Sequence, residues 1–405
     1  MNSPKFRKAL LWLLAAALLS GGTSYLIRGV RLPWTIDNDC DMRLRHEEYS
    51  LFAQHLYPHR RVAEAAGIAV VTKNTVYPPY AFPMFAAVFW PATFEGARAL
   101  FQVFTLAALG AMMWYGAREL GFAGKPAALL GASVPFAFSG NCSAVALGQF
   151  SIICAAFVVL QVALLKRNRP ALAGICWALA MLKPQIGLPF AVLFLVSQQW
   201  RGLVTGGMLL ALLTVLALWW THVAPWNFWQ QGVASQTLKF AAEGGGAGLW
   251  VHAFGINPRA ATLAGLGMVV AFGVALLFRQ IRSKFTTDTA AAMCAVLGAS
   301  LFYHHHYDNM MFVPLILPLL VSCLRTGRPS LYAASALLAL TVYAPPSFLV
   351  KFSAQFPETD WIVFLVPGAA AVVLWVCSAH MECVPCREVA GHPPIVDSRK
   401  KRGLG

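Results

Sequence analysis

Charged side chains are scarce in this 405-residue sequence. Asp, Glu, Lys and Arg together make up only 12% of it, whereas a water-soluble domain ordinarily carries about 25%. Hydrophobic residues account for 58% and the mean hydropathy is +0.62. This composition excludes a water-soluble globule. It predicts an all-α polytopic membrane protein, and the apolar runs are sufficient for about 10–12 transmembrane helices.

Acidic residues are the scarcer of the two charged classes, with 16 against 31 basic residues and a net charge of +15. In a soluble protein this excess would suggest nucleic acid as a partner. Here the Lys and Arg residues lie mostly in short loops between apolar runs, which is the pattern that sets membrane topology. We therefore expect the lipid bilayer, with its anionic headgroups, as the partner, and no nucleic acid.

Paired cysteines are almost absent. Nine Cys are scattered along the chain, and Cys154, Cys176 and Cys294 lie inside apolar runs, which favours small buried side chains over disulfides. Cys383 and Cys386 form the one tight pair. A structural zinc site needs a second ligand pair, and none follows, so no metal site is predicted.

The amino-terminal segment predicts the orientation of the chain. Lys5, Arg7 and Lys8 precede an apolar run over residues 9–27, so the amino terminus should be cytoplasmic. The run has no convincing small-residue cleavage pattern at its end, which favours a retained anchor. Residues 28–95 are then expected to form the first extracytoplasmic loop.

The later apolar runs alternate with basic loops and predict one transmembrane domain over residues 1–380, with a second long extracytoplasmic loop at 221–257. The tail at 381–405 is polar and basic, and is expected to be cytoplasmic and disordered. Residues 171–199 either cross twice or form a bent hairpin turning at Pro184. The other expected helices are 97–115, 126–138, 147–165, 202–220, 259–278, 289–303, 310–323, 330–346 and 361–378.

The polar segment at 37–80 is the first place where chemistry is expected. It opens with Asp37, Asp39 and Asp41 directly after the hydrophobic anchor. A carboxylate at a membrane surface can take a proton from an acceptor hydroxyl. Asp41 is the candidate general base, with Asp39 as the alternative. The competing interpretation is an acidic loop or a helix cap.

An amphipathic interfacial helix is predicted just after Asp41. Its apolar face is expected to lie opposite Arg45, Glu47 and Gln54, with helical spacing among Leu44, Leu51, Phe52, His55 and Leu56. The apolar stretch at 81–91 is too short to span comfortably, so it is expected to be interfacial or re-entrant.

A histidine run lies at the top of the helix predicted over 289–303. His304, His305 and His306 are followed by Asp308. Three consecutive residues on a helix point in different directions, so they cannot all bind one metal ion. One or two of them, with Asp308 orienting an imidazole, would bind phosphate or support the base. The alternative is a polar helix end.

Two further polar residues sit at breaks in apolar runs. Lys183, beside Pro184, suits a phosphate headgroup, although its ammonium group could equally extend to the interface. Gln149 could donate to a sugar or serve helix packing. The predicted topology puts these residues on the same side of the membrane as Asp41 and the histidine run.

Several motifs in order resemble glycosyltransferase family 87, the alpha-mannosyltransferase-like members of the GT-C superfamily. They are Asp41-Met-Arg-x-Arg-x-x-Glu48, Leu56-Tyr57-Pro58, Tyr77-Pro78-Pro79, Gly148-Gln149-Phe150, Arg169-Pro170, Leu182-Lys183-Pro184 and Tyr303-His-His-His-Tyr307-Asp308. The resemblance implies a GT-C-like helical bundle. It also implies an inverting hexosyltransferase that moves mannose from a polyprenyl-phosphate donor to a lipid or glycan acceptor, without a cofactor.

The same resemblance assigns roles to residues. It implies that Asp41 is the catalytic base, that His306 and Asp308 are the late His and Asp of the family, and that Lys183 belongs to its Lys-Pro element. The predicted substrate-binding residues are these three together with His304, Gln149, Tyr77 and Arg45. The resemblance further implies a multi-pass protein of the plasma membrane whose active site faces the periplasm or the exterior.

Two other functions compete with the enzyme. A transporter or flippase of lipid-linked sugars would need ionisable residues near the bilayer midplane and inverted repeats, but the polar groups map to one side and no internal repeat is evident. A noncatalytic membrane assembly subunit is the third interpretation, because a fold alone does not specify a reaction.

Overall fold

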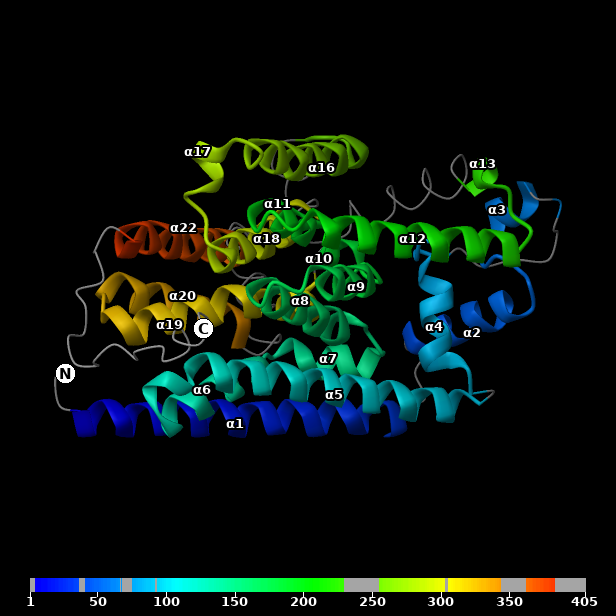
Figure 1. Cartoon of the computed structure of the whole chain (residues 1–405). Helices are drawn as coiled ribbons and strands as arrows, with labels where there is room; N and C mark the ends of the chain where they lie inside the picture. Colours follow the sequence, from blue (N-terminus) through cyan, green and yellow to red (C-terminus); the bar gives the residue numbers. More distant parts are fainter. Residues whose placement is uncertain are drawn as a thin grey trace, which may run out of the picture.

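The computed structural model describes residues 4–35, 41–65, 67, 75–91, 93–228, 255–302, 305–343 and 362–382. Every regular element of these residues is a helix, which confirms the predicted all-α class (Figure 1). The elements are α1 (Pro4–Thr35), α2 (Asp41–Ala53), α3 (Arg60–Ala65), α4 (Ala81–Phe89), α5 (Phe94–Leu120), η1 (Gly121–Ala123), α6 (Lys125–Phe136), α7 (Gly140–Leu147), α8 (Ser151–Lys166), α9 (Pro170–Ala180), α10 (Pro184–Gly187), η2 (Leu188–Val192), α11 (Leu193–Val196), α12 (Trp200–Trp220), α13 (Pro225–Asn227), α16 (Pro258–Ala275), α17 (Arg279–Arg282), α18 (Thr287–Leu301), η4 (His306–Phe312), α19 (Val313–Thr326), α20 (Pro329–Tyr343) and α22 (Ile362–Glu382).

Several helices are long and apolar enough to cross a membrane. Among the described residues four qualify alone, and α6 with α7, bent by 48° at the break between them, makes a fifth. Seven shorter apolar helices accompany them. These helices confirm a polytopic membrane protein, whereas the expected total of about 10–12 crossings stays a prediction. The four single candidates are Pro4–Leu32, Phe94–Ala123, Trp200–Trp220 and His306–Thr326.

The outer face of α12 shows how the molecule meets lipid. Val204, Met208, Leu212 and Trp219 are each between 58% and 68% exposed, although all four side chains are large and apolar. A continuous apolar surface of this kind would promote aggregation in water. Such a surface is stable where it faces the hydrocarbon chains of a lipid bilayer.

Small residues allow the helices to pack closely. Gly116 on α5 and Gly131 on α6 face each other so closely that a Cβ on either one would collide with the carbonyl oxygen of the other. Close approach through glycine is a common packing mode inside membranes, where lipid tails remove most of the hydrophobic driving force between helices.

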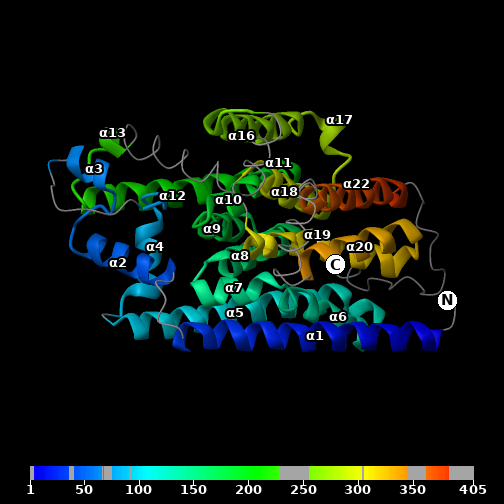
Figure 2. The ribbon, with the colours of Figure 1, turned by 180° about the vertical axis from the view of Figure 1, so that it is seen from behind.

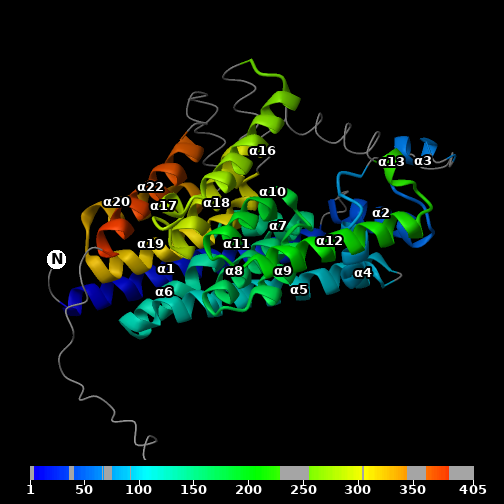
Figure 3. The ribbon, with the colours of Figure 1, turned by 45° about the horizontal axis from the view of Figure 1, so that its top comes forward.

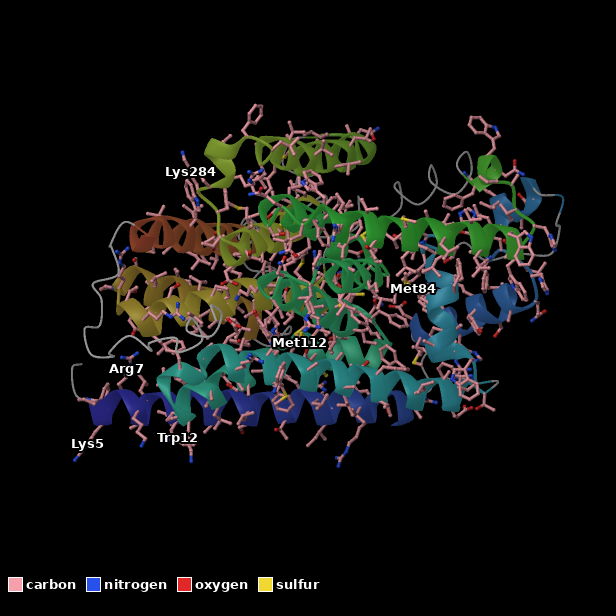
Figure 4. The ribbon with its side chains drawn as sticks, in the orientation of Figure 1. Lys5, Arg7, Trp12, Met84, Met112 and Lys284 are labelled. Atoms are coloured by element: carbon pink, nitrogen blue, oxygen red, sulfur yellow. The ribbon has the colours of Figure 1, made fainter. Side chains whose placement is uncertain are left out.

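One end of the bundle carries the amino terminus and several basic groups. Lys5 and Arg7 at the start of α1 lie at the same end as Lys284, which follows α17 (Figure 4). The Arg7 guanidinium donates to the carbonyl oxygen of Leu324, near the end of α19, over 2.7 Å. The loops expected on the cytoplasmic side therefore meet.

An ion-pair cluster ties more of these loops together. The Lys166 ammonium at the end of α8 lies 3.1 Å from the Glu119 carboxylate and 2.8 Å from that of Asp288. The carbonyl of Leu165 also accepts from the Gln199 amide, just before α12, over 2.9 Å. These contacts thus join the ends of four helices, α5, α8, α12 and α18.

The opposite end is built by α2, α3, α4 and α13, which stay together in all three ribbon views (Figures 1, 2 and 3). The Trp220 indole N–H at the end of α12 donates to the Phe52 carbonyl over 2.9 Å. The His55 ring stacks on the Trp220 ring with 4.0 Å between centroids. These contacts fix α2 to the long helix α12.

Two expectations about the first loop need correction. The first helix continues to Thr35, beyond the expected end at residue 27. The helix predicted after Asp41 exists as α2, but its buried side chains are Met42, Arg45, Glu48 and Phe52, and His55 is exposed. Of the residues that the pattern assigned to the polar face, Gln54 is exposed, whereas Arg45 is turned inward, where it pairs with Glu48.

The expected bend within 171–199 is present. The helix α9 ends at Ala180 and α10 begins at Pro184, because proline cannot extend the helical hydrogen-bond ladder. The Trp177 indole N–H donates across the bend to the Gly187 carbonyl over 3.0 Å. Lys183 occupies the turn itself. The structure therefore carries Lys183 on a sharp corner inside the bundle.

Candidate functional site

The start of α2 meets the turn between α7 and α8. Asp41 is the first residue of α2, and its carboxylate accepts a hydrogen bond from the side-chain amide of Gln149. Gln149 is buried, with only 8% exposed. A residue from a helix break more than 100 positions later therefore orients the expected base through a neutral group.

Gly148 makes this contact sterically feasible. It ends α7 in the left-handed conformation, with φ of +72°, which only glycine adopts without strain. A Cβ at this position would also overlap the side chain of Met42 on α2. Both requirements exclude larger residues at the one turn that holds Asp41.

Gly148→Ala should therefore displace α2 and impair the site. The left-handed backbone alone costs an L-residue about 1–2 kcal/mol, and the overlap with Met42 adds to it. We expect a lower unfolding temperature in detergent and weaker sugar transfer. Gly110→Ala is the control, because Gly110 lies in an exposed helical position with open space around it. Equal behaviour of the two variants would contradict the account.

A buried ion pair lies beside this turn. The Lys183 ammonium is 2.7 Å from the Asp308 carboxylate, and the Ser151 hydroxyl lies 2.8 Å from Lys183 and 2.5 Å from Asp308. Lys183 is 5% exposed and Asp308 is fully buried. Buried charges must be paired and hydrogen-bonded to be tolerated. Ser151, Lys183 and Asp308 meet that condition at the start of α8.

Asp308 also shapes the segment that carries the histidines. Its second carboxylate oxygen accepts from the backbone N–H of His305 over 3.3 Å and caps η4. The His306 ring nitrogen Nε2 lies 2.9 Å from the Ser143 hydroxyl on α7. His306 is thereby held against the same α7–α8 region that holds Asp41.

A second ion pair lies on the buried face of α2. The Arg45 guanidinium is 2.5 Å from the Glu48 carboxylate and stacks 4.9 Å above the ring centroid of Tyr77. Arg45 is 7% exposed, Tyr77 8%, and Glu48 is fully buried. The expectation that Arg45 and Tyr77 bind substrate stays a prediction.

The pKa of Glu48 is higher than is usual for a glutamate. Burial raises its pKa from 4.5 to about 7, although the charge of Arg45 and a hydrogen bond from the Thr75 side chain lower it, and the nearby Asp41 charge raises it further. Glu48 therefore changes its ionisation near neutral pH.

The structure gathers most of the expected site residues around the α7–α8 turn. Gln149 contacts Asp41, and Ser151, two positions later, contacts both Lys183 and Asp308. His306 contacts α7 through Ser143. The remaining candidates Asp39 and His304 lie outside the described residues.

Sequence reasoning missed the importance of Glu48, Ser143 and Ser151. A signal existed for Glu48, which lies three residues after Arg45 and seven after Asp41 and so shares their helical face. Nothing in the sequence distinguished the two serines from other small residues of apolar helices, because their role comes from tertiary packing.

These features define a helical membrane protein with buried ionisable side chains concentrated at one turn. The family model described as glycosyltransferase family 87 matches residues 75–314, which is more than half of the chain. The chain belongs to glycosyltransferase family 87, and that family implies a membrane glycosyltransferase. No curated protein and no solved structure matches the chain. The matched segment includes Gln149, Lys183 and Asp308, and Asp41 precedes it.

Proposed function

We propose that this membrane glycosyltransferase moves one sugar, with mannose expected from the family resemblance, from a polyprenyl-phosphate donor to a lipid or glycan acceptor. The reaction inverts the configuration at the sugar carbon. Asp41 acts as the general base. The observation that carries the proposal is the meeting of Asp41, Lys183, Asp308 and His306 around a single turn, which is supported by the contacts of Gln149, Ser151 and Ser143.

The base would act in a single displacement. The acceptor hydroxyl attacks the anomeric carbon of the sugar while an oxygen of Asp41 takes the hydroxyl proton. The bond from the anomeric carbon to the phosphate oxygen breaks, and the polyprenyl phosphate leaves with the electron pair. Gln149 supports this role, because a neutral amide orients the carboxylate without removing its negative charge.

The leaving phosphate would be stabilised by the groups around Ser151. An ammonium group carries three N–H donors, and Lys183 uses two of them for Ser151 and Asp308. We assign the third to a phosphate oxygen of the donor. The imidazole of His306 is the second donor in this proposal. Donors placed in advance where negative charge develops lower the barrier most effectively.

The two ends of the bundle support an orientation for the active site. The basic groups around Arg7 and Lys166 gather at one end, and cytoplasmic loops are the ones enriched in Lys and Arg. The end built by α2, α3 and α4 would then face the periplasm or the exterior. We propose a plasma-membrane location with a cytoplasmic amino terminus on the same ground.

The direct test is sugar transfer by the purified protein. Polyprenyl-phosphate mannose and related donors are supplied with lipid extract from cells that lack the gene, and the products are analysed by mass spectrometry. We expect one lipid or glycan that gains a single sugar, and equal turnover in excess chelator, because Lys183 and His306 stabilise the leaving group without a metal.

Other results would redirect the assignment. Loss of turnover in chelator would contradict the metal-free mechanism. Movement of the donor across a proteoliposome membrane with no covalent product would favour a flippase over a transferase.

A further inference from the structure

The buried face of α2 offers its arginine two acidic partners. Asp41 lies four residues before Arg45 and Glu48 three residues after it, so all three share one helical face. An arginine at such spacing can pair with either carboxylate. In the structure Arg45 pairs with Glu48 at 2.5 Å, and Asp41 is bound by the Gln149 amide instead.

We propose that Glu48 is a positioning residue that holds the Arg45 guanidinium away from Asp41 and so leaves Asp41 free to accept a proton. The inference rests on the proposed function, in which Asp41 is the base. Glu48 itself touches no reacting atom. It acts through its ion pair with Arg45.

The choice of partner matters because an arginine beside a carboxylate favours its ionised form. A carboxylate stabilised in this way is a weaker base, and a weaker base removes a proton more slowly. The Gln149 amide, which carries no charge, orients Asp41 instead. The ion pair of Arg45 with Glu48 therefore keeps the Arg45 guanidinium away from the Asp41 carboxylate on the same helix.

The surroundings of Arg45 support a fixed position. Its guanidinium stacks on the buried ring of Tyr77, whose backbone N–H donates to the Thr75 hydroxyl over 3.1 Å. Within the part of the chain that the structure describes, the groups that face Glu48 are Arg45 and Asp41 from α2 and three residues outside that helix, namely Tyr57, Thr75 and Tyr77. Arg45 is the one basic group among them.

Protonation of Glu48 should weaken its hold on Arg45. Because burial raises the pKa of Glu48 to about 7, the carboxyl is mostly ionised above neutral pH and mostly neutral below it. The rate of sugar transfer by the wild-type protein should accordingly approach that of a variant with an uncharged residue 48 as the pH falls from about 8 to about 6.

The experiment measures donor-dependent sugar transfer against pH for four purified proteins. They are the wild type, Glu48→Gln, Glu48→Asp and the double variant Arg45→Met/Glu48→Gln. We expect Glu48→Gln to lower the plateau rate by about 10- to 100-fold and to move the acid limb of the rate to lower pH. The deficit should shrink below pH 7. Glu48→Asp should retain much of the wild-type rate.

The double variant provides the decisive comparison. Removing Arg45 from the Glu48→Gln protein should raise its rate at saturating donor, because the guanidinium released by the loss of Glu48 is gone. Loss of the substrate contact predicted for Arg45 would instead raise the donor concentration that is needed. A double variant no faster than Glu48→Gln would overturn the proposal, and so would an acid limb that does not move.

The proposed function has its own outcome in the same assay. An active wild type that loses transfer with Asp41→Asn upholds the function, whatever the variants at residue 48 do. A wild type that forms no product with any donor would overturn both the function and this proposal.

Discussion

Asp41→Asn is expected to lower the rate of sugar transfer by about 10²- to 10⁴-fold, the range associated with loss of a general base. The variant should fold normally, because asparagine keeps an oxygen that accepts from the Gln149 amide. The unfolding temperature in detergent and the affinity for the donor should therefore stay close to those of the wild type. Steady-state kinetics with the purified protein give the rate and its dependence on donor concentration, and thermal unfolding in detergent gives the unfolding temperature.

Matched variants separate this effect from a general loss of negative charge. Glu64→Gln removes an exposed carboxylate on α3 that pairs only with the exposed Arg60 among the described contacts, and it should transfer at the wild-type rate. Asp39→Asn tests the alternative base. Full activity of Asp41→Asn, together with loss of activity in Asp39→Asn, would transfer the role to Asp39.

Lys183→Met is expected to be strongly destabilising. It leaves the fully buried Asp308 carboxylate without its cation, and removing one partner of a buried pair typically costs about 3–5 kcal/mol. The double variant Lys183→Met/Asp308→Asn removes both charges and should recover most of the stability. Asn at 308 can still accept from the backbone N–H of His305. Thermal unfolding in detergent measures the effect.

The double variant also tests the assignment of Lys183 to the donor phosphate. If its third N–H binds the phosphate, the restored fold should still transfer sugar poorly and should require more donor. A double variant that is both stable and fully active would show that the pair serves the fold alone. Arg60→Met is the control, because its exposed partner Glu64 is solvated and little change in stability is expected.

The helices of this protein could largely be predicted from the sequence. Apolar runs between basic loops located most of them, and Pro184 marked the bend after α9, because proline has no backbone N–H to continue the hydrogen-bond ladder of α9. The residues at which the helices end were less predictable. The helix α1 continues to Thr35 through residues 28–35, which include arginines, because helical backbone geometry does not depend on hydrophobicity.

The site was only partly predictable. Individual residues such as Asp41, Lys183 and Asp308 stood out because ionisable groups are costly in apolar surroundings. Their partners did not, since the pairing of Lys183 with Asp308 joins positions 125 residues apart and depends on how the helices pack. The inward turn of Glu48 was missed for a different reason. A pattern of apolar positions assigns charged residues to water and contains no information on which of them form an ion pair.

Cysteine cross-linking in native membranes shows whether α2 meets the α7–α8 turn. Cysteines replace Asp41 and Gln149 together, or Glu64 and Gln149 as the control, and disulfide-linked peptides are identified by mass spectrometry after mild oxidation. We expect a linked peptide for positions 41 and 149 and none for positions 64 and 149. Absence of the first link, with both cysteines shown to be reactive, would contradict the site described above.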